Sequence, residues 1–284
     1  PHFEDLLTKL GNARVFSKLD ARSAYHQAEL AEDSRHLTTF ITPWGLYRFK
    51  RVPFGLASAP AAFQRMMEKI LEGIEGVIVY LDDILVHGRD RKEHDERLDR
   101  VLERVRETGM TLNEKCEIGK REIEFVGYAI SSEGVRPTAE NMKAIEGLPE
   151  PTNTTQIKSV LGTASFYMRC VPNFSTLAEP IRKLLKTDVE FEWGSKQKQA
   201  FSNLKKAIID AKPLAIFDHT KEIIVASDAS NVGCGACLLQ VHGDGERPVA
   251  FASCALSDAQ KNYSAGEKEA LACVFAIERW HVFL

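Results

Sequence analysis

The 284-residue sequence has no long apolar run, little cysteine and no excess of basic residues. No stretch approaches the roughly 18 consecutive apolar residues of a membrane-spanning helix, so we expect no membrane partner. The six cysteines are scattered without a disulfide framework, which favours an intracellular location, cytoplasmic or nuclear, over secretion. The formal net charge of −3 also differs from the strongly basic balance of a general nucleic-acid-binding protein.

Charge is distributed unevenly along the chain. Residues 136–186 contain seven Lys or Arg against four Glu, a local excess of +3 that marks a candidate nucleic-acid surface. Residues 89–107 carry seven charges of each sign, which predicts a solvated amphipathic helix with Leu98, Val101, Leu102 and Val105 on its buried side. We infer no binding function for that helix.

Periodicity and turn residues predict a chain of mixed helices and strands. Helices are expected near 5–10, 60–71, 89–107, 138–147, 153–168, 174–186 and 195–210, and from about 264 onward. Strands are expected near 15–20, 37–41, 46–49, 77–79, 84–86, 214–218, 222–227, 235–240 and 248–253, with a strand pair within 111–130. Cys234 and Cys237 have the spacing of a zinc or redox pair, but no second pair accompanies them. Their apolar, glycine-rich surroundings favour buried small residues instead.

Two predicted strand ends carry aspartates. Tyr80-Leu81-Asp82-Asp83 lies between two apolar runs, which predicts a tight hairpin with carboxylates at its tip. A second apolar strand, residues 15–20, ends in Asp20. Two strands that deliver carboxylates to a common end suit a two-magnesium phosphoryl-transfer site. Taken alone, however, these aspartates are better explained as a turn cap and turn formers.

Five sequence blocks decide between these interpretations. They are residues 16–27, 52–64, 80–86, 125–128 and 227–236. In order and spacing, the blocks resemble the reverse transcriptase of gypsy-type long-terminal-repeat retrotransposons, which are relatives of the retroviral enzymes. The last block is similar to the first strand of the ribonuclease H domain in the same polyproteins. Agreement of five blocks is far more specific than a single short motif.

The resemblance implies an α+β fold. It implies a polymerase palm, an antiparallel sheet backed by helices, together with part of the fingers over residues 1–135. A helical thumb over 136–186 and a connecting segment over 187–213 follow. An incomplete, truncated ribonuclease H-like α/β domain occupies 214–284.

The resemblance also implies a polymerase site. Asp20 and Asp82, with Asp83 in support, are the expected ligands of Mg2+, for which Mn2+ can substitute. One ion lowers the pKa of the primer 3′-hydroxyl, and the second neutralises the triphosphate and the pyrophosphate. The expected nucleotide-binding residues are Ala24, Tyr25 and Phe54. The ring of Tyr25 selects deoxynucleotides by colliding with a 2′-hydroxyl, although a core aromatic would explain the same residue.

Contacts with template and primer are implied for a further group of residues. They are Pro60, Phe63, Gln64, Phe125, Gly127 and Tyr128. An ordinary helix N-terminus would explain the first three, and a buried strand the last three. The expected partners are an RNA or DNA template with its primer, deoxynucleoside triphosphates and the rest of the parent polyprotein.

Asp228 and Glu269 match the first two metal ligands of a ribonuclease H site, and Glu267 is the residue most easily confused with Glu269. Such sites use further carboxylates from later strands and a final helix, whereas this chain ends at Leu284. We therefore expect no ribonuclease H activity from this chain alone.

The sequence thus predicts an RNA-directed DNA polymerase. One rival is a catalytically idle, element-derived protein that only binds nucleic acid, and another is a protein-interaction scaffold. Because relatives place an extended fingers segment upstream, we expect the isolated chain to bind primer–template but to extend it poorly. If the triphosphate clamp lies within the chain, Lys50 and Arg51 are the first candidates.

Overall fold

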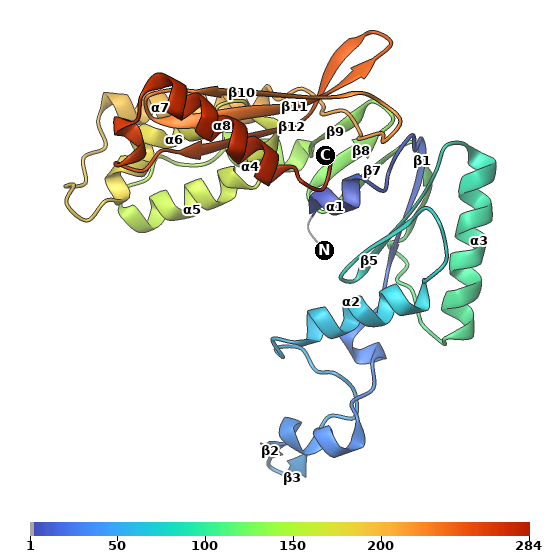
Figure 1. Ribbon diagram of the computed structural model, residues 1–284. Helices are drawn as coiled ribbons and strands as arrows, with labels where there is room; N and C mark the ends of the chain where they lie inside the picture. The colour runs from blue at the N-terminus through green and yellow to red at the C-terminus, as the bar shows by residue number, and fades with distance from the viewer. Residues whose placement is uncertain (1–2) are drawn as a thin grey trace. The chain divides into compact units, whose positions relative to one another are not determined.

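The computed structural model describes residues 3–284, which divide into two compact units, one extending to Phe125 and one from Val126 to Leu284. Both units combine helices with antiparallel sheets (Figure 1), so the predicted α+β class is confirmed. Each unit has a hydrophobic core of its own. None of the helices among the described residues has both the length and the apolar character needed to cross a bilayer.

The first unit is built on a four-stranded sheet in the order β4-β5-β1-β6. Its strands are β1 (Val15–Asp20), β4 (Val77–Tyr80), β5 (Asp83–Gly88) and β6 (Glu117–Lys120). Apolar residues form most of the buried positions of β1, β4 and β5, among them Phe16, Ile78 and Ile84, as expected for strands that pack against other elements. Both strands predicted to carry the aspartates are present, and β1 pairs antiparallel with β5 in the middle of the sheet.

Two helices, α2 (Ala59–Ile70) and α3 (Arg91–Glu107), complete the core of this unit. Phe63 and Met67 of α2 pack with Val101 of α3 and with Ile84 of β5. Asp90 caps the N-terminus of α3, and its carboxylate accepts a hydrogen bond from the backbone N–H of Glu93. Charged residues cover the rest of α3, so the predicted amphipathic helix is confirmed.

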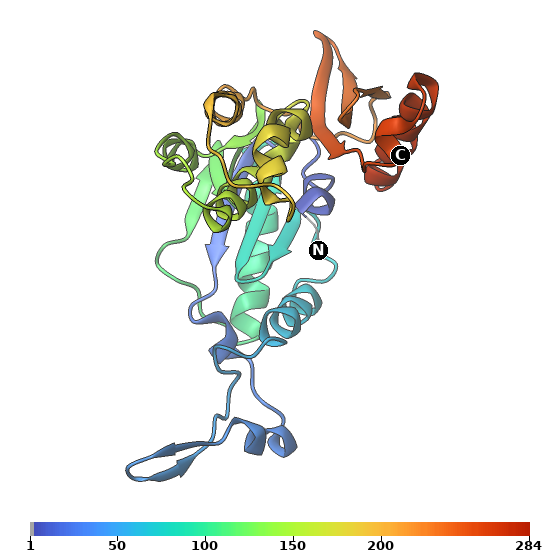
Figure 2. The same ribbon diagram turned by 90° about the vertical axis from the view of Figure 1, so that its left-hand side faces the viewer.

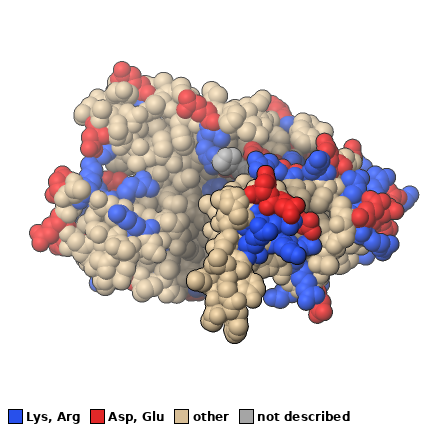
Figure 3. All heavy atoms as spheres, turned by 90° about the horizontal axis from the view of Figure 1, so that it is seen from below, with Lys and Arg blue, Asp and Glu red and all other residues tan. Residues whose placement is uncertain are grey.

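A short hairpin projects from the first unit (Figures 1 and 2) and consists of β2 (Phe40–Thr42) and β3 (Gly45–Tyr47). The predicted turn Thr42-Pro43-Trp44-Gly45 is present, although both strands are shorter than expected. The side chain of Trp44 is 84% exposed, and Ile41 and Leu46 are similarly open to solvent. The projection nearest the viewer in Figure 3 is almost free of charged groups.

The remaining elements of the first unit correct two predictions. They are α1 (Phe3–Leu7), η1 (Ala24–Gln27), η2 (Glu32–Thr38) and β7 (Glu122–Phe125). The first helix begins and ends earlier than the expected 5–10. The strands expected within 111–130 are present, but the first begins only at Glu117, because the N–H and C=O of Thr111 bond to the Gln27 side chain and the Arg22 backbone.

The second unit begins with a β-hairpin and four α-helices. These are β8 (Tyr128–Ser131), β9 (Gly134–Pro137), α4 (Ala139–Glu146), α5 (Thr154–Ser165), α6 (Phe174–Arg182) and α7 (Ser195–Ile209), with single 3-10 turns at Met168–Cys170 and Lys183–Leu185. All four predicted helices are present. The third ends as an α-helix at Arg182 and continues as a 3-10 turn.

A three-stranded antiparallel sheet with one packed helix completes the second unit (Figure 2). Its elements are β10 (Ile223–Ala229), β11 (Gly233–His242), β12 (Gly245–Ala255), a 3-10 turn (Gln260–Asn262) and α8 (Ala265–Arg279). Trp280, just after α8, is fully buried and packs with Ala276 and Leu238. The amphipathic helix predicted from about residue 264 is confirmed.

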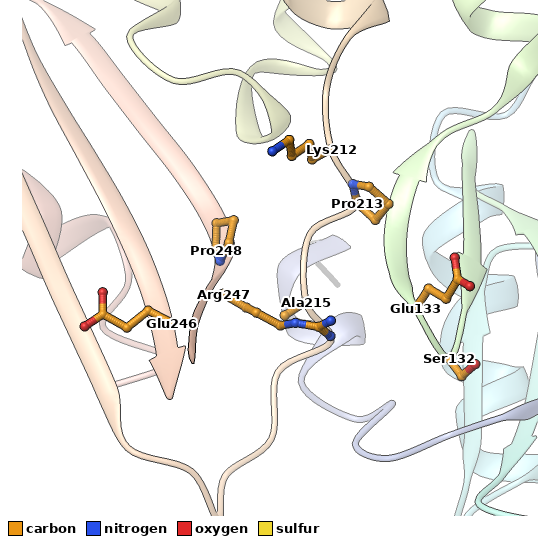
Figure 4. A pocket seen from close by; sticks show the side chains of 8 residues that line it. All are labelled: Ser132, Glu133, Lys212, Pro213, Ala215, Glu246, Arg247 and Pro248. Carbon is orange, nitrogen blue, oxygen red and sulfur yellow. The ribbon is translucent and has the colours of Figure 1, made fainter. Parts of the chain in front are cut away.

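The strand expected near 214–218 is absent, because this segment bridges two elements instead of joining one sheet. Leu214 exchanges two backbone hydrogen bonds of 2.8 Å with Val135 of β9, and the N–H of Ala215 donates to Pro248 of β12 at 2.7 Å. Beside it lies a pocket of about 670 Å3 (Figure 4). Gly134 at φ +137° allows the close approach, since a Cβ there would clash with the Leu214 carbonyl.

Candidate active site

The end of β1 and the tip of the β4–β5 hairpin bring three carboxylates together. Asp20, the last residue of β1, lies directly opposite Asp83, the first residue of β5. The intervening turn is formed by Leu81 and Asp82, so Asp82 is the exposed carboxylate at its tip. The N–H of Ala21 donates to the Asp82 carbonyl at 3.1 Å and ties the two chain segments together. The predicted convergence of Asp20, Asp82 and Asp83 on one edge of the sheet is therefore present.

Asp20 is held by a residue that the sequence did not single out. The side-chain amide of Asn113 donates to Asp20 Oδ2 at 3.3 Å, and the Asn113 backbone N–H donates to the Asp20 carbonyl at 2.8 Å. These contacts fix the direction of the Asp20 carboxylate. No local pattern could have identified Asn113, because 93 residues separate it from Asp20.

The surroundings of Asp83 raise its pKa. Burial raises the pKa of Asp83, and the charges of Asp82 and Asp20 raise it further, while Lys18 opposes them. Lys18 lies two residues before Asp20 on β1 and therefore on the same face of the sheet. Because alternate residues of a strand share a face, the spacing of Lys18 and Asp20 in the sequence could have identified Lys18 as a neighbour of the site. A site in which negative charges repel one another favours a bound cation.

The carboxylate oxygens of Asp20, Asp82 and Asp83 suit a divalent cation whose other ligands are water and substrate oxygens. Carboxylate oxygens are the hard ligands that Mg2+ prefers, and Mg2+ commonly uses one or two of them together with water and phosphate oxygens. Within residues 3–284, no group of three or more His, Cys, Asp or Glu side chains is arranged to hold an ion by itself. Asp20 and Asp82, with Asp83 beside Asp20, suit a site of this kind, in which the protein supplies only some of the ligands.

An aromatic cluster follows β1. The ring of Tyr25 lies 5.4 Å from the ring of Phe54 and 5.8 Å from that of Phe63, both in edge-to-face geometry. Phe54 is 63% exposed, whereas Ala24, the residue before Tyr25, is buried. The structure thus brings together the three residues predicted to bind the nucleotide, with Phe63 supporting the Tyr25 ring from the core.

The predicted template contacts on α2 are corrected for two of three residues. Pro60 is partly exposed in the first turn of α2. Phe63 is only 1% exposed, and Gln64 is 6% exposed with its amide bonded to the β4–β5 turn. Side chains buried to this extent do not touch a nucleic acid directly, so Phe63 and Gln64 support the surface from behind.

A similar correction applies to two of the predicted primer contacts. Phe125 in the first unit is buried and packs edge-on against Tyr80, with ring centroids 6.5 Å apart. Tyr128 in the second unit is buried, stacks on Phe166 and donates its hydroxyl to the Phe166 carbonyl at 2.6 Å. Gly127, at φ +75°, is partly exposed and keeps the left-handed backbone that glycine adopts readily.

The second unit places Asp228 and Glu269 on neighbouring elements, and both are exposed. Asp228 lies in β10 opposite Gly235, and Glu269 lies in the first turns of α8. Cys273, one helical turn beyond Glu269, approaches the Ser227 hydroxyl at 3.2 Å and so brings this side of α8 beside β10.

Glu267 has a different role from Glu269. It accepts a hydrogen bond from the backbone N–H of Ser264 at 2.8 Å, while Ser264 caps α8 in return, and this bond lowers the pKa of Glu267. Glu267 therefore takes part in the helix cap, which favours Glu269 as the candidate metal ligand of the two.

The cysteine pair in the second unit lacks the chemistry of a metal site. Cys234 and Cys237 lie three residues apart in β11, so their side chains point to opposite faces of the sheet. Burial raises the pKa of each thiol to about 11. Metals bind the thiolate, so the raised pKa argues against a metal site at either cysteine. Cys234 is buried as expected, and Cys237 is half-buried.

Comparison with known proteins gives consistent similarities over the whole chain. Residues 1–130 match the family model of reverse transcriptase (RNA-dependent DNA polymerase), and residues 193–284 match that of the RNase H-like domain found in reverse transcriptase. The full chain is 35% identical to the Transposon Tf2-3 polyprotein of Schizosaccharomyces pombe (strain 972 / ATCC 24843) and 34% identical to the Tf2-7 polyprotein. It spans 22% of the length of each relative.

Solved structures show the same fold. The foamy viral protease-reverse transcriptase dRH in complex with double-stranded DNA aligns with 99% of this chain and 50% of its own, at a TM-score of 0.91 and 24% identity. The foamy viral protease-reverse transcriptase in complex with RNA/DNA hybrid aligns with 99% and 39%, at a TM-score of 0.88 and 24% identity.

Proposed function

Because the chain belongs to the reverse transcriptases of gypsy-type long-terminal-repeat retrotransposon polyproteins, we propose that it carries the polymerase site of an RNA-directed DNA polymerase. This site adds deoxynucleotides to a primer paired with an RNA or DNA template. The observation that carries the proposal is the pairing of Asp20 with Asp83 beside the exposed Asp82. Three carboxylates on one sheet edge repel one another unless a cation joins them, and phosphoryl transfer requires such cations.

In this proposal Asp20 and Asp82 bind Mg2+, with Asp83 in support. The bound ions would lower the pKa of the primer 3′-hydroxyl and neutralise charge on the triphosphate. Asn113 holds the Asp20 carboxylate in one orientation through its 3.3 Å hydrogen bond. Lys18 offsets part of the negative charge around Asp83 and so limits the repulsion within the site. Positioning and electrostatics of this kind supply most of the catalysis in phosphoryl transfer.

Tyr25 is proposed as the residue that selects deoxynucleotides. Its ring is fixed between Phe54 and Phe63 by two edge-to-face contacts. A ring held on two sides cannot turn away from a 2′-hydroxyl, which is what discrimination by collision requires. The small buried residue Ala24 leaves its backbone free to line the adjoining 3′-hydroxyl pocket, and the exposed face of Phe54 borders the nucleotide.

A primer–template duplex is proposed as the macromolecular partner. The foamy viral relatives of the same fold were solved with double-stranded DNA and with RNA/DNA hybrid. The basic excess of residues 136–186, proposed as the thumb, suits contacts with phosphates. Residues 1–135 are proposed as palm with part of the fingers, 187–213 as a connecting segment and 214–284 as the ribonuclease H-like part. Gly127 and Pro60 remain the proposed primer and template contacts, and the rest of the polyprotein remains a proposed partner.

Asp228 and Glu269 are proposed as two ligands of a ribonuclease H-type metal site, because both are exposed and Glu269 lies one helical turn before Cys273, which contacts Ser227, the neighbour of Asp228. That this chain alone does not cleave the RNA strand of a hybrid stays a prediction, and incubation with labelled RNA/DNA hybrid and Mg2+ tests it.

Primer extension tests the proposed polymerase function. The reverse transcriptase of the parent polyprotein is compared with its Asp82→Asn variant and with Asp99→Asn, which changes an exposed aspartate on α3. We expect Asp82→Asn to abolish Mg2+-dependent extension while binding primer–template normally, and Asp99→Asn to behave as wild type. Binding without extension by the wild-type protein would instead support the idle nucleic-acid-binding alternative.

A further inference from the structure

Gln64 of α2 is a buried amide that contacts the turn carrying Asp82. Its Oε1 accepts a hydrogen bond from the backbone N–H of Leu81 at 2.6 Å. Its Nε2 donates to the Val79 carbonyl and to Glu68 Oε1, both at 2.9 Å. The amide therefore bonds to the hairpin backbone on both sides of Tyr80. The bond to Glu68 requires Nε2 to face Glu68, which leaves Oε1 to face Leu81.

The turn formed by Leu81 and Asp82 has a backbone conformation that its sequence does not favour. Leu81 has φ +55°, in the left-handed region that residues with a Cβ rarely adopt. Two-residue hairpin turns usually place Gly, Asn or Asp at such a position, because these residues tolerate positive φ. The leucine side chain cannot form the local hydrogen bonds that let Asn and Asp tolerate a positive φ. The conformation of Leu81 must therefore be held by its surroundings, and the 2.6 Å bond to Gln64 is a direct restraint on it.

We propose that Gln64 is a positioning residue for the polymerase reaction, which keeps the Leu81 turn in its left-handed conformation and thereby aims the Asp82 carboxylate at the metal site. This inference rests on the proposed function. Asp82 follows Leu81 directly, so a change in the Leu81 backbone redirects the Asp82 side chain. The three hydrogen bonds use one acceptor and two donors, which a glutamine amide alone supplies at that length.

The proposal differs from a direct contact with nucleic acid and from a purely structural core role. A direct contact would make primer–template affinity depend on Gln64. A core role would change stability without changing how the folded protein uses Mg2+. A positioning role predicts a lower kcat and a higher half-saturating Mg2+ concentration at nearly unchanged duplex affinity.

Steady-state primer extension by the parent reverse transcriptase, with Mg2+ titration and primer–template Kd, distinguishes these roles. For Gln64→Leu we expect kcat to fall at least tenfold and half-saturating Mg2+ to rise at least threefold, with Kd within twofold of wild type. The matched control is Gln199→Leu, because Gln199 of α7 bonds to Asn203 four residues on, as Gln64 bonds to Glu68. The control should leave kcat and Mg2+ dependence unchanged.

A rescue experiment tests the backbone part of the proposal. Glycine adopts φ +55° without steric hindrance. Leu81→Gly in the Gln64→Leu background should therefore raise kcat at least threefold over that of Gln64→Leu alone. No recovery would show that Gln64 does not act through the Leu81 conformation.

Glu68→Ala provides a second test if Gln64→Leu does not fold. Glu68 is exposed, so its replacement should leave folding unchanged and only allow the Gln64 amide to rotate. We expect a several-fold fall in kcat with a parallel rise in half-saturating Mg2+. Unchanged Mg2+ dependence in the folded variants, or a Kd that weakens as much as kcat falls, would overturn the proposal. The Asp82→Asn variant separates this failure from failure of the proposed function. An active Asp82→Asn protein would refute the proposed function and this inference with it, whereas an inactive Asp82→Asn protein beside a Gln64→Leu protein with wild-type kinetics would refute this inference alone.

Discussion

His87 makes the stability of the first unit depend on pH. Its ring is 5% exposed in β5, and among the described residues its Nε2 has no hydrogen-bond partner. Burial lowers the pKa of His87 to about 4 from an ordinary value of 6.5, with Arg97 and His94 lowering it and Glu93 opposing them. Between these values the unfolded chain binds a proton that the folded chain does not, so stability falls as the pH falls through this window.

The size of the effect follows from the shift. One unit of pKa corresponds to about 1.4 kcal/mol, so His87 contributes at most roughly 3 kcal/mol, all of it lost below pH 4. Between pH 7.5 and pH 5, the first unit should lose about 2 kcal/mol of unfolding free energy from this residue. Such a loss is a substantial part of the stability of an ordinary domain.

The unfolding free energy of this unit is measured separately by urea-induced unfolding at a series of pH values, with hydrogen exchange of β5 peptides as the readout. In His87→Leu the ring cannot titrate, so the difference between variant and wild type should grow by about 2 kcal/mol from pH 7.5 to pH 5. The exposed His36 is the matched control, and His36→Gln should keep the wild-type dependence. Parallel pH profiles for wild type and His87→Leu would refute the reasoning.

Three further predictions concern activity. Asp82→Asn should lower primer extension by more than about 100-fold with folding unchanged, because the cation loses a ligand, and substantial residual extension would remove Asp82 from the site. Tyr25→Val should reduce discrimination against ribonucleotides by about 10-fold or more in competition assays, with a smaller effect on rate, and unchanged selectivity would contradict its role. Neutralising Lys158, Arg182 and Lys183 together should lower the slope of log affinity against log salt by about 2 to 3, and an unchanged slope would place the duplex elsewhere.

The sequence by itself determined the elements that carry the proposed polymerase site. Alternating and continuous apolar runs identified β1 and the β4–β5 hairpin, and the aspartates at their ends identified the candidate ligands. Local patterns suffice to locate these strands and their turn, because apolar runs and the residues between them mark where strands begin and end. The helix α3 was equally clear, because its apolar stripe recurs with the helical period.

Tertiary structure alone decided which residues support that site. Asn113 reaches Asp20 across 93 residues, and Gln64 reaches the Leu81 turn from a separate helix. Phe63 and Tyr128 were expected at the surface and lie in the core, because the burial of an aromatic ring depends on which element packs over it. Pairings between distant segments are set by packing and hydrogen bonding of the whole unit, and no local sequence pattern encodes them.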